Sequence, residues 1–222
     1  AVRDGCERLL LPSVENEIRS DLSDRAHTSS IEVFSLNLEK LLSQPPLKGR
    51  IVLGFDPGFY NGCKLAVLDE TGKMLMVDKI FPFNGDKAQE AAKQKLVSLL
   101  RKYSVQIIAI GNGTASREAE SVVAEVLKTI PHEAAYMVVS EAGASVYSAS
   151  KLAAEEFPEY DVSLRSAVSI ARRMQDPLAE LVKIDPQAIG VGQYQHDMPK
   201  KEMTAALDGV VEDCVNHVGV DL

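Results

Sequence analysis

The sequence has little of several features that would assign a protein class directly. Its three cysteines, Cys6, Cys63 and Cys214, lie far apart, form no Cys-x-x-Cys pair and have no zinc-type spacing with the four histidines. This pattern excludes a disulfide framework and fits a reducing compartment, so we expect a cytoplasmic protein. No apolar run approaches the roughly 18 residues of a membrane-spanning helix, and we expect no membrane association.

Basic charge is also in deficit. The chain has 24 Lys and Arg against 32 Asp and Glu, a net charge of −8, which excludes a module that binds nucleic acid through bulk positive charge. Hydrophobic residues make up 45% and charged residues 25%, ordinary globular values that exclude collagen-like and wholly disordered classes. The 222 residues suffice for one large domain, or for a domain with helical extensions. The chain begins with Ala1 rather than Met, and we expect it to be part of a longer protein.

The two ends of the chain predict helical extensions. Within residues 1–48, apolar residues recur at helical spacing on both sides of a polar break at 28–30, and Pro45-Pro46 ends the pattern. The two stripes are Leu10, Val14, Ile18, Leu22 and Ala26, then Ile31, Phe34, Leu38, Leu41 and Leu42. We therefore predict two amphipathic helices, which cannot bury their stripes alone and must pack on something else. Residues 184–222 predict a loop followed by a helix.

The middle of the chain, residues 49–183, predicts an α/β domain. Short apolar runs separated by turn residues predict an antiparallel meander of three strands at 51–55, 63–68 and 73–80. Two further strands, 105–110 and 136–139, alternate with helices and should run parallel to the first strand. The order β-β-β-α-β-α-β-α is that of the ribonuclease H-like fold, so we predict a mixed five-stranded sheet with flanking helices.

Three carboxylates are candidates for metal-dependent chemistry. Asp56 follows the first strand and Glu141 the fifth, so if these strands lie near each other the two acids can bind Mg²⁺ or Mn²⁺. Two such ions can clamp a scissile phosphate and activate water, with Asp176 as a third acid. Each acid also has a structural interpretation: Asp56 starts a Pro-Gly turn, Glu141 opens a helix, and Asp176 caps the helix that begins at Pro177.

Two further features indicate contacts with phosphate groups. The segment 111–116, Gly-Asn-Gly-Thr-Ala-Ser, joins a strand to a helix, where backbone amides attract phosphate. Ser116 stands where a dinucleotide fingerprint has its third glycine, which favours a nucleic-acid contact or a plain helix entry over a nicotinamide site. A locally basic stretch occurs in the late helices: Arg165, Arg172, Arg173 and Lys183. These side chains either position a phosphate backbone or form ion pairs on a solvated face.

Four segments carry a resemblance to a known family. They are Gly-Phe-Asp-Pro-Gly at 54–58, the runs 110–118 and 139–148, and the run 164–184, which continues through 189–197. On these strings the chain from residue 51 resembles the YqgF-type domain of the Tex family of bacterial transcription accessory proteins, and residues 1–44 resemble the preceding segment. The resemblance implies a cytoplasmic, multidomain protein that binds RNA or DNA and influences transcription. It also implies helix-hairpin-helix and OB-fold parts beyond residue 222.

The same resemblance implies a set of site residues, because the YqgF domain is similar to Holliday-junction resolvases. Their acidic cluster corresponds to Asp56 and Glu141, as ligands for Mg²⁺ or Mn²⁺, and less closely to Asp176. The implied nucleic-acid contacts are Asn112, Thr114, Arg117, Arg165, Arg172 and Arg173. The sequence departs from the pattern at two places: Gly111-Asn112-Gly113 replaces an acid after the fourth strand, and Tyr60 stands where the family has a basic residue.

These departures decide between the functional hypotheses. Fewer acids and a lost cation favour a binding protein, in which the ribonuclease H-like domain is a scaffold within a transcription accessory factor that contacts nucleic acid and the transcription machinery. The alternative is a metal-dependent, structure-selective nuclease of the Holliday-junction resolvase type. A third class, the actin-like ATPases and sugar kinases, needs two such domains, which 222 residues with one aspartate-glycine turn do not supply.

Overall fold

The structure is a computed structural model that describes residues 2–130 and 134–218. The chain divides into two compact units: residues 1–41 together with 190–222, and residues 42–189. Each unit is described by itself below. In the described part of the chain, no helix is both long and apolar enough to span a membrane.

The unit of residues 42–189 is built on one five-stranded sheet. Its strands are β1 (Val52–Asp56), β2 (Cys63–Leu68), β3 (Met74–Ile80), β4 (Ile107–Gly111) and β5 (Ala135–Val139). The spatial order is β3-β2-β1-β4-β5, with β1, β2 and β3 antiparallel and with β1, β4 and β5 parallel. This confirms the predicted mixed sheet. The sheet also puts β4 between β1 and β5, so the strands that carry Asp56 and precede Glu141 are not neighbours.

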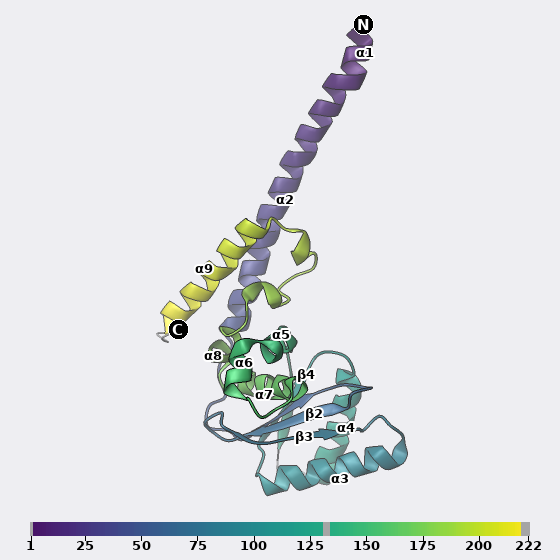
Figure 1. Ribbon diagram of the computed structural model, residues 1–222, viewed down its shortest axis with the longest axis vertical. Coiled ribbons are helices and arrows are strands. Elements are labelled where there is room, and N and C mark those ends of the chain that lie inside the picture. The colour runs from purple at the N-terminus through teal and green to yellow at the C-terminus, as the bar shows by residue number, and fades with distance from the viewer. Residues whose placement is uncertain (1, 131–133, 219–222) are drawn as a thin grey trace. The chain divides into compact units, whose positions relative to one another are not determined.

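Helices cover both faces of this sheet (Figure 1). One face carries α3 (Asp86–Lys102) and α4 (Ser116–Thr129). The other carries α5 (Ala144–Ala149), α6 (Lys151–Glu156) and α7 (Val162–Gln175), and α8 (Pro177–Leu181) follows α7 directly. Successive residues of a strand point to opposite faces, so Leu53 and Phe55 pack in the core under α3 and α4, whereas Val52 packs in the core under α7.

The contact between α7 and β1 is unusually close because of a glycine. A Cβ atom built on Gly54 would lie 2.1 Å from the carbonyl oxygen of Ala167 and 2.9 Å from the Cβ of Ala171. Only a residue without a side chain lets the α7 backbone lie this near the strand. The approach brings the first turns of α7 beside the carboxyl end of β1, where Asp56 lies.

The other unit contains a helix that the sequence predicted with a break. The chain is helical from Val2 to Leu42, through α1 (Val2–Gly5), a π-helical turn (Cys6–Leu10) and α2 (Leu11–Leu42). The predicted interruption at residues 28–30 is therefore wrong. Serine and threonine cost only tenths of a kcal/mol in a helix interior, and the Thr28 hydroxyl donates to the Asp24 carbonyl oxygen within the helix, at 3.0 Å.

The two apolar stripes of this helical segment have different fates. The second stripe is buried at Ile31, Phe34 and Leu38, and Asn37 donates from its side chain to the Val191 carbonyl oxygen at 2.8 Å. The first stripe, from Leu10 to Leu22, is exposed, so no part of the described chain provides the partner on which it is predicted to pack, and that packing stays a prediction. Two short 3₁₀ helices (Pro186–Ala188 and Gln195–Asp197) and the predicted final helix, α9 (Lys200–Val218), complete the chain.

Candidate functional site

The carboxyl end of the parallel strands forms a polar pocket. Because β1, β4 and β5 run in the same direction, the loops that follow them meet at one edge of the sheet, the usual position of ligand sites in sheets of this kind. A pocket of about 540 Å³ opens there. Its polar lining consists of Asp56, Lys64, Thr114, Glu141, Ser145, Ser148, Asp161, Ser163 and Ser166. Asp56 and Glu141 therefore share one pocket.

Asp56 is held by two partners from its own chain. The Lys64 ammonium lies 3.3 Å from Asp56 Oδ2, and both side chains are mostly buried, with 15% and 13% of their surface exposed. The register of the β1–β2 pairing places these two residues directly opposite each other. From α7, the Ser166 hydroxyl donates a short hydrogen bond of 2.5 Å to the same carboxylate oxygen. An internal cation and an internal donor thus stabilise the negative charge of Asp56.

Glu141 reaches this pocket across the end of β4, where no side chain obstructs it. A Cβ on Gly113 would lie 1.6 Å from Glu141 Oε1, and a Cβ on Gly111 would lie 2.4 Å from Oε2. The Gly-Asn-Gly segment, which replaces an acid in the resolvase pattern, is therefore the space that the Glu141 carboxylate occupies. This explains how residues after two non-adjacent strands come to line one pocket.

The Glu141 carboxylate lies in an environment unfavourable to its charge. Burial raises its pKa above the ordinary value, and the negative charge of Asp56 raises the pKa further. A backbone hydrogen bond from Gly113 and the positive charges of Lys64 and Arg173 act in the opposite direction but do not cancel the effect. The Oε2 atom is buried and has no hydrogen-bond partner in the described structure. A bound cation would relieve the repulsion between these two carboxylates.

Two predicted nucleic-acid contacts instead hold the Glu141 loop. The backbone N–H of Glu141 donates to the side-chain oxygen of Asn112 at 3.0 Å. The buried Arg173 donates to the Ser140 carbonyl oxygen at 2.7 Å, and its desolvation lowers its pKa to about 10. Asn112 and Arg173 therefore position the backbone on which Glu141 stands.

The other predicted arginines are also engaged within the chain. Arg165 is buried and donates to the Ser148 carbonyl oxygen at 3.3 Å. Arg172 donates to Glu156 at 2.7 Å and lies over the Phe157 ring, 5.1 Å from its centroid. Thr114, which lines the pocket, and Arg117, in the first turn of α4, are exposed. Of the predicted contacts, these two and Asn112 are exposed, and Asn112 already accepts from the Glu141 N–H.

Asp176 does not join Asp56 and Glu141. It follows the last residue of α7, and its carboxylate accepts from the Ala179 N–H at 3.2 Å, which makes it the N-cap of α8. Ser166 lies ten residues earlier on the same helix, so about 15 Å of helix separates the two positions. The α7 residue that approaches Asp56 is therefore a serine, not an acid.

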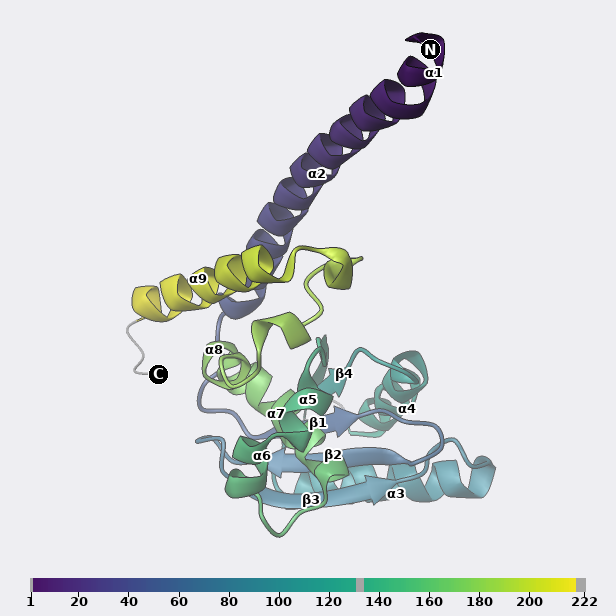
Figure 2. The ribbon, with the colours of Figure 1, turned by 45° about the horizontal axis from the view of Figure 1, so that its top comes forward.

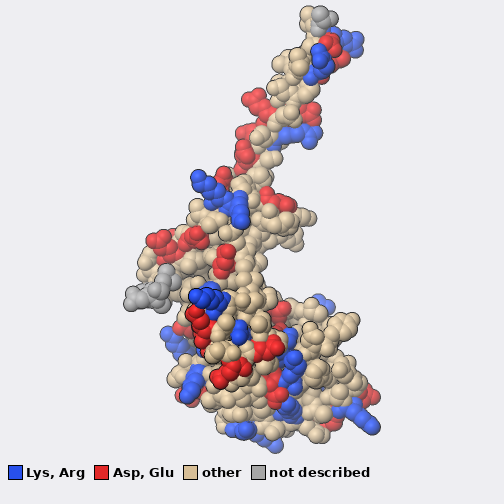
Figure 3. Space-filling view, in the orientation of Figure 1, with Lys and Arg blue, Asp and Glu red and all other residues tan. Residues whose placement is uncertain are grey.

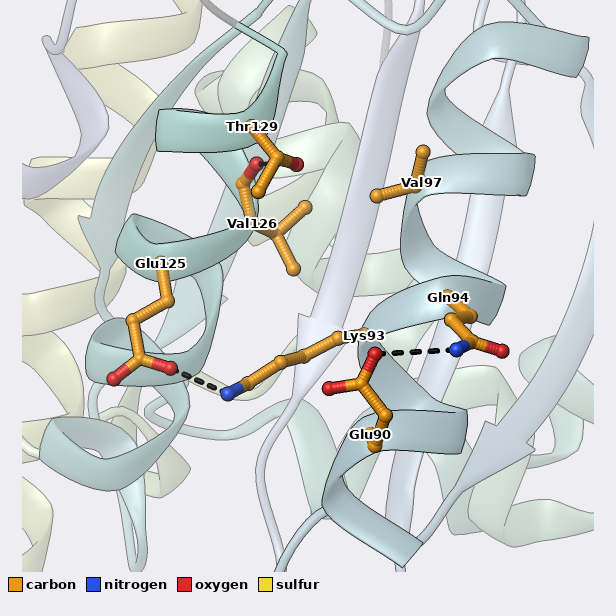
Figure 4. Close-up of a pocket in the computed structure, with 7 residues that line it drawn as sticks. All are labelled: Glu90, Lys93, Gln94, Val97, Glu125, Val126 and Thr129. Atoms are coloured by element: carbon orange, nitrogen blue, oxygen red, sulfur yellow. Dashed lines mark hydrogen bonds and ion pairs between the residues drawn. The ribbon is translucent and has the colours of Figure 1, made fainter. Parts of the chain in front are cut away.

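A second hollow lies on the outer helical layer, between α3 and α4 (Figure 4). It has a volume of about 480 Å³, with Val97 and Val126 among its lining residues. Lys93 extends across it from α3 to Glu125 on α4, at 2.5 Å, and Glu90 accepts from Gln94 at 3.1 Å. Lys93 and Glu125 therefore pair with each other, and Glu90 accepts from a neutral amide, so the hollow offers a ligand no unpaired cation among its lining residues.

Electrostatics around the site are mixed. On the face of the α/β unit drawn in Figure 3, acidic and basic side chains alternate. Across residues 2–130 and 134–218, no three His, Cys, Asp or Glu side chains converge as a set of metal ligands. The pocket offers three carboxylates. Asp56 already faces an ammonium group, Asp161 caps α7 by accepting from the Ser163 N–H, and Glu141 is the third.

Sequence analysis missed several residues of the pocket, among them Lys64 and Ser166, which contact Asp56 directly. The signal for Lys64 lies in the hairpin: an antiparallel pairing of the predicted strands that matches Val52 with Leu68 also matches Asp56 with Lys64. The signal for Ser166 is the recurrence of serine every third residue at 163, 166 and 169 on one predicted helix. Both signals depend on knowing how the elements pair in space.

The sheet order β3-β2-β1-β4-β5, with its helical layers and an aspartate at the end of β1, defines a ribonuclease H-like domain. The family model described as the Tex protein YqgF-like domain matches residues 50–175. The chain therefore belongs to the Tex YqgF-like family.

Curated relatives extend the match over nearly the whole chain. It is 54% identical to "Protein tex" of Bordetella pertussis, covering 96% of this chain and 27% of the relative. It is 53% identical to "Transcriptional accessory protein Tex" of Neisseria gonorrhoeae, covering 94% and 27%. It is also 45% identical to human "S1 RNA-binding domain-containing protein 1", covering 100% and 22%. The chain thus spans less than a third of the length of these relatives.

Proposed function

We propose that the chain is part of a nucleic-acid-binding transcription accessory factor of the Tex type, and that its ribonuclease H-like domain serves mainly as a binding scaffold. Membership of the Tex YqgF-like family supports this proposal, as do relatives named as a transcriptional accessory protein and as an S1 RNA-binding-domain protein. Nucleic acid, the transcription machinery and the cytoplasm are the partners and compartment that follow from it.

The main support for the proposal is that the Asp56 carboxylate already has a cation and a hydrogen-bond donor from its own chain. Metal-dependent phosphodiester hydrolysis uses several carboxylates to hold divalent ions on both sides of the scissile phosphate. Here Asp56 pairs with the Lys64 ammonium at 3.3 Å and with the Ser166 hydroxyl, and α7 supplies no acid beside it. This donor set does not fit a pair of divalent ions, which favours a scaffold.

A specific observation favours the alternative, a metal-dependent nuclease. Glu141 has a buried, unpartnered Oε2 atom, and the charge of Asp56 raises its pKa. One Mg²⁺ or Mn²⁺ ion held by these two carboxylates would relieve that repulsion. Asp176 would take no part, since it caps α8.

One comparison of variants separates the two functions. The 222-residue chain, its Asp56→Asn variant and an Asp213→Asn control on the exposed surface of α9 are incubated with four-way junctions and single-stranded RNA in Mg²⁺ or Mn²⁺. We expect that all three proteins bind these nucleic acids. We also expect that Asp56→Asn removes no cleavage activity that the wild type and the control show. Cleavage by the wild type and the control, but not by Asp56→Asn, would establish the nuclease instead.

The binding itself is tested by its dependence on salt. Contacts with phosphate release counterions, so the affinity for nucleic acid should fall steeply as the salt concentration rises. Between about 50 and 200 mM salt, a protein with several phosphate contacts loses roughly a thousand-fold or more in affinity. Fluorescence anisotropy of labelled RNA and DNA measures this slope. Absence of binding, or binding that salt does not change, would contradict the scaffold proposal.

A further inference from the structure

A group of aromatic side chains is exposed beside the pocket. Its exposed members are Phe59 and Tyr60 in the β1–β2 loop and Phe81 in the β3–α3 loop. Phe83, also in the β3–α3 loop, is partly buried against the core, and we call the four residues together the aromatic rim. Three of the six phenylalanines of the chain lie here. Tyr60 is 95% exposed, Phe81 42% and Phe59 37%. Large apolar rings gathered on a surface mark a site of interaction.

The two loops hold these rings in place through contacts with each other. The Phe59 and Phe83 rings lie 5.3 Å apart between centroids, at an angle of 56°. Phe81 covers Gly62, where an added Cβ would lie 2.7 Å from a ring carbon. Because Gly62 has a φ of +75°, the loop turns sharply just after Tyr60. The rim is therefore a packed feature of the fold.

The aromatic rim lies at the same end of the sheet as the pocket. β1 and β3 run in the same direction, since each is antiparallel to β2, so the loops that follow them leave one edge of the sheet (Figure 2). The strand register aligns Asp56 with Lys64 and Lys64 with Lys79 on the helix-α7 face. The Lys79 stem also lies against Gly62, 3.0 Å from an added Cβ. Lys79 therefore lies against the same turn as Phe81, whereas Lys64 is paired with Asp56.

We propose that the aromatic rim stacks on unpaired bases of a single-stranded nucleic acid whose phosphates run past Lys79. Ring faces for bases, combined with neighbouring cations for phosphates, are the two features that single-strand binding sites share. The base faces inside a duplex are already stacked on one another, so exposed rings select unpaired strands. The inference rests on the proposed nucleic-acid binding and names the class of strand that this domain takes.

The test uses a tryptophan placed at the most exposed ring. The chain contains no tryptophan, so Tyr60→Trp introduces a single fluorophore into the aromatic rim while keeping an aromatic face. We expect its emission to be quenched by single-stranded RNA or DNA, and not by an oligonucleotide of abasic sugar-phosphate units. Tyr60→Ala should weaken binding of single strands about ten-fold, within the range for loss of one stacked base. Tyr194→Ala, which removes another exposed tyrosine from the other unit, is the matched control and should leave the affinity unchanged.

Each outcome of this test supports or overturns the inference. Binding by the wild type that Tyr60→Ala does not weaken would overturn it while leaving the proposed function intact. No binding of single strands by the wild type would overturn both. Equal quenching by the abasic strand would overturn the inference, because it would show that the rim responds to the phosphates and not to stacked bases. If Tyr60→Ala abolished a contact with a protein partner and left nucleic-acid binding unchanged, the rim would be a protein-docking surface and the inference would be wrong.

Discussion

Replacing Lys64 by Met tests the central interaction of the pocket. The substitution keeps most of the side-chain volume and removes the ammonium that lies 3.3 Å from Asp56 Oδ2. At an effective dielectric constant of 20, two charges at that separation attract by about 5 kcal/mol, and breaking a buried pair typically costs about 3–5 kcal/mol. Because Ser166 still donates to Asp56 and each side chain is slightly exposed, we expect a loss of about 3 kcal/mol.

Thermal unfolding followed by circular dichroism measures this loss. For a unit of this size each kcal/mol lowers Tm by about 3 °C, so Lys64→Met should melt about 9 °C below the wild type. Lys87→Met, at an exposed position in the first turn of α3, is the control and should melt with the wild type. Combining Lys64→Met with Asp56→Asn removes the unpaired charge and should recover most of the stability.

Manganese extends the same experiment to the function of the pocket. If the ammonium takes the place of a metal ion, millimolar Mn²⁺ should raise the Tm of Lys64→Met and leave that of the wild type unchanged. A Lys64→Met variant that melts within about 2 °C of the wild type, a change worth less than 1 kcal/mol, would refute the reasoning about Asp56. Equal stabilisation of both proteins by Mn²⁺ would show that Lys64 does not exclude a cation.

Three further predictions follow from other contacts. The pKa of Glu141 is raised in the folded state, so its charge destabilises the fold above that pKa, and this destabilisation is relieved as the pH falls through it. Glu141→Gln should therefore raise Tm at pH 7 by about 2–4 °C and flatten the dependence of Tm on pH. A variant whose Tm depends on pH as that of the wild type does would contradict this prediction. Gly54→Ala should lower Tm by about 5 °C or more, because the new Cβ would lie 2.1 Å from an α7 carbonyl oxygen. The control, Gly209→Ala inside α9, has no atom within 4 Å of the new Cβ and should leave Tm unchanged or raise it. Melting curves that reverse this order would be inconsistent with the packing of α7 on β1. Burial raises the pKa of the Cys63 thiol to about 11, so iodoacetamide at pH 8 should label the partly exposed Cys6 and spare Cys63; peptide mass spectrometry checks this, and equal labelling would argue against burial.

Much of the fold could be predicted from the sequence because its elements are locally encoded. Turn residues separate the strands, and apolar periodicity marks α3 and α4, so the observed strands begin and end within two residues of the predicted ones. The helix through residues 28–30 could not be predicted in the same way. Its serines and threonine are weak helix formers, and the penalty is too small to end a helix whose neighbouring turns are well formed.

The candidate site was less accessible to sequence reasoning than the fold. Asp56 and Glu141 were identified as a pair, although the expected reason, proximity of their strands, does not hold because β4 lies between them. The actual reason is the absence of side chains at Gly111 and Gly113. Asp176 has the residue type of a catalytic acid, but it caps α8 and does not line the pocket of Asp56 and Glu141. Residue type alone does not reveal which turn of a helix meets a given strand.

The close packing of α7 on β1 links the evolution of the core to that of the pocket. Gly54, Ala167 and Ala171 meet at a separation that has no room for one more methyl group. Ser166 is the residue before Ala167, so any substitution that pushes the helix outward also draws its hydroxyl away from Asp56. Descendants of this sequence can therefore enlarge the small residues only together with a new partner for the aspartate, so the hydrogen bond in the pocket restrains substitution in the core.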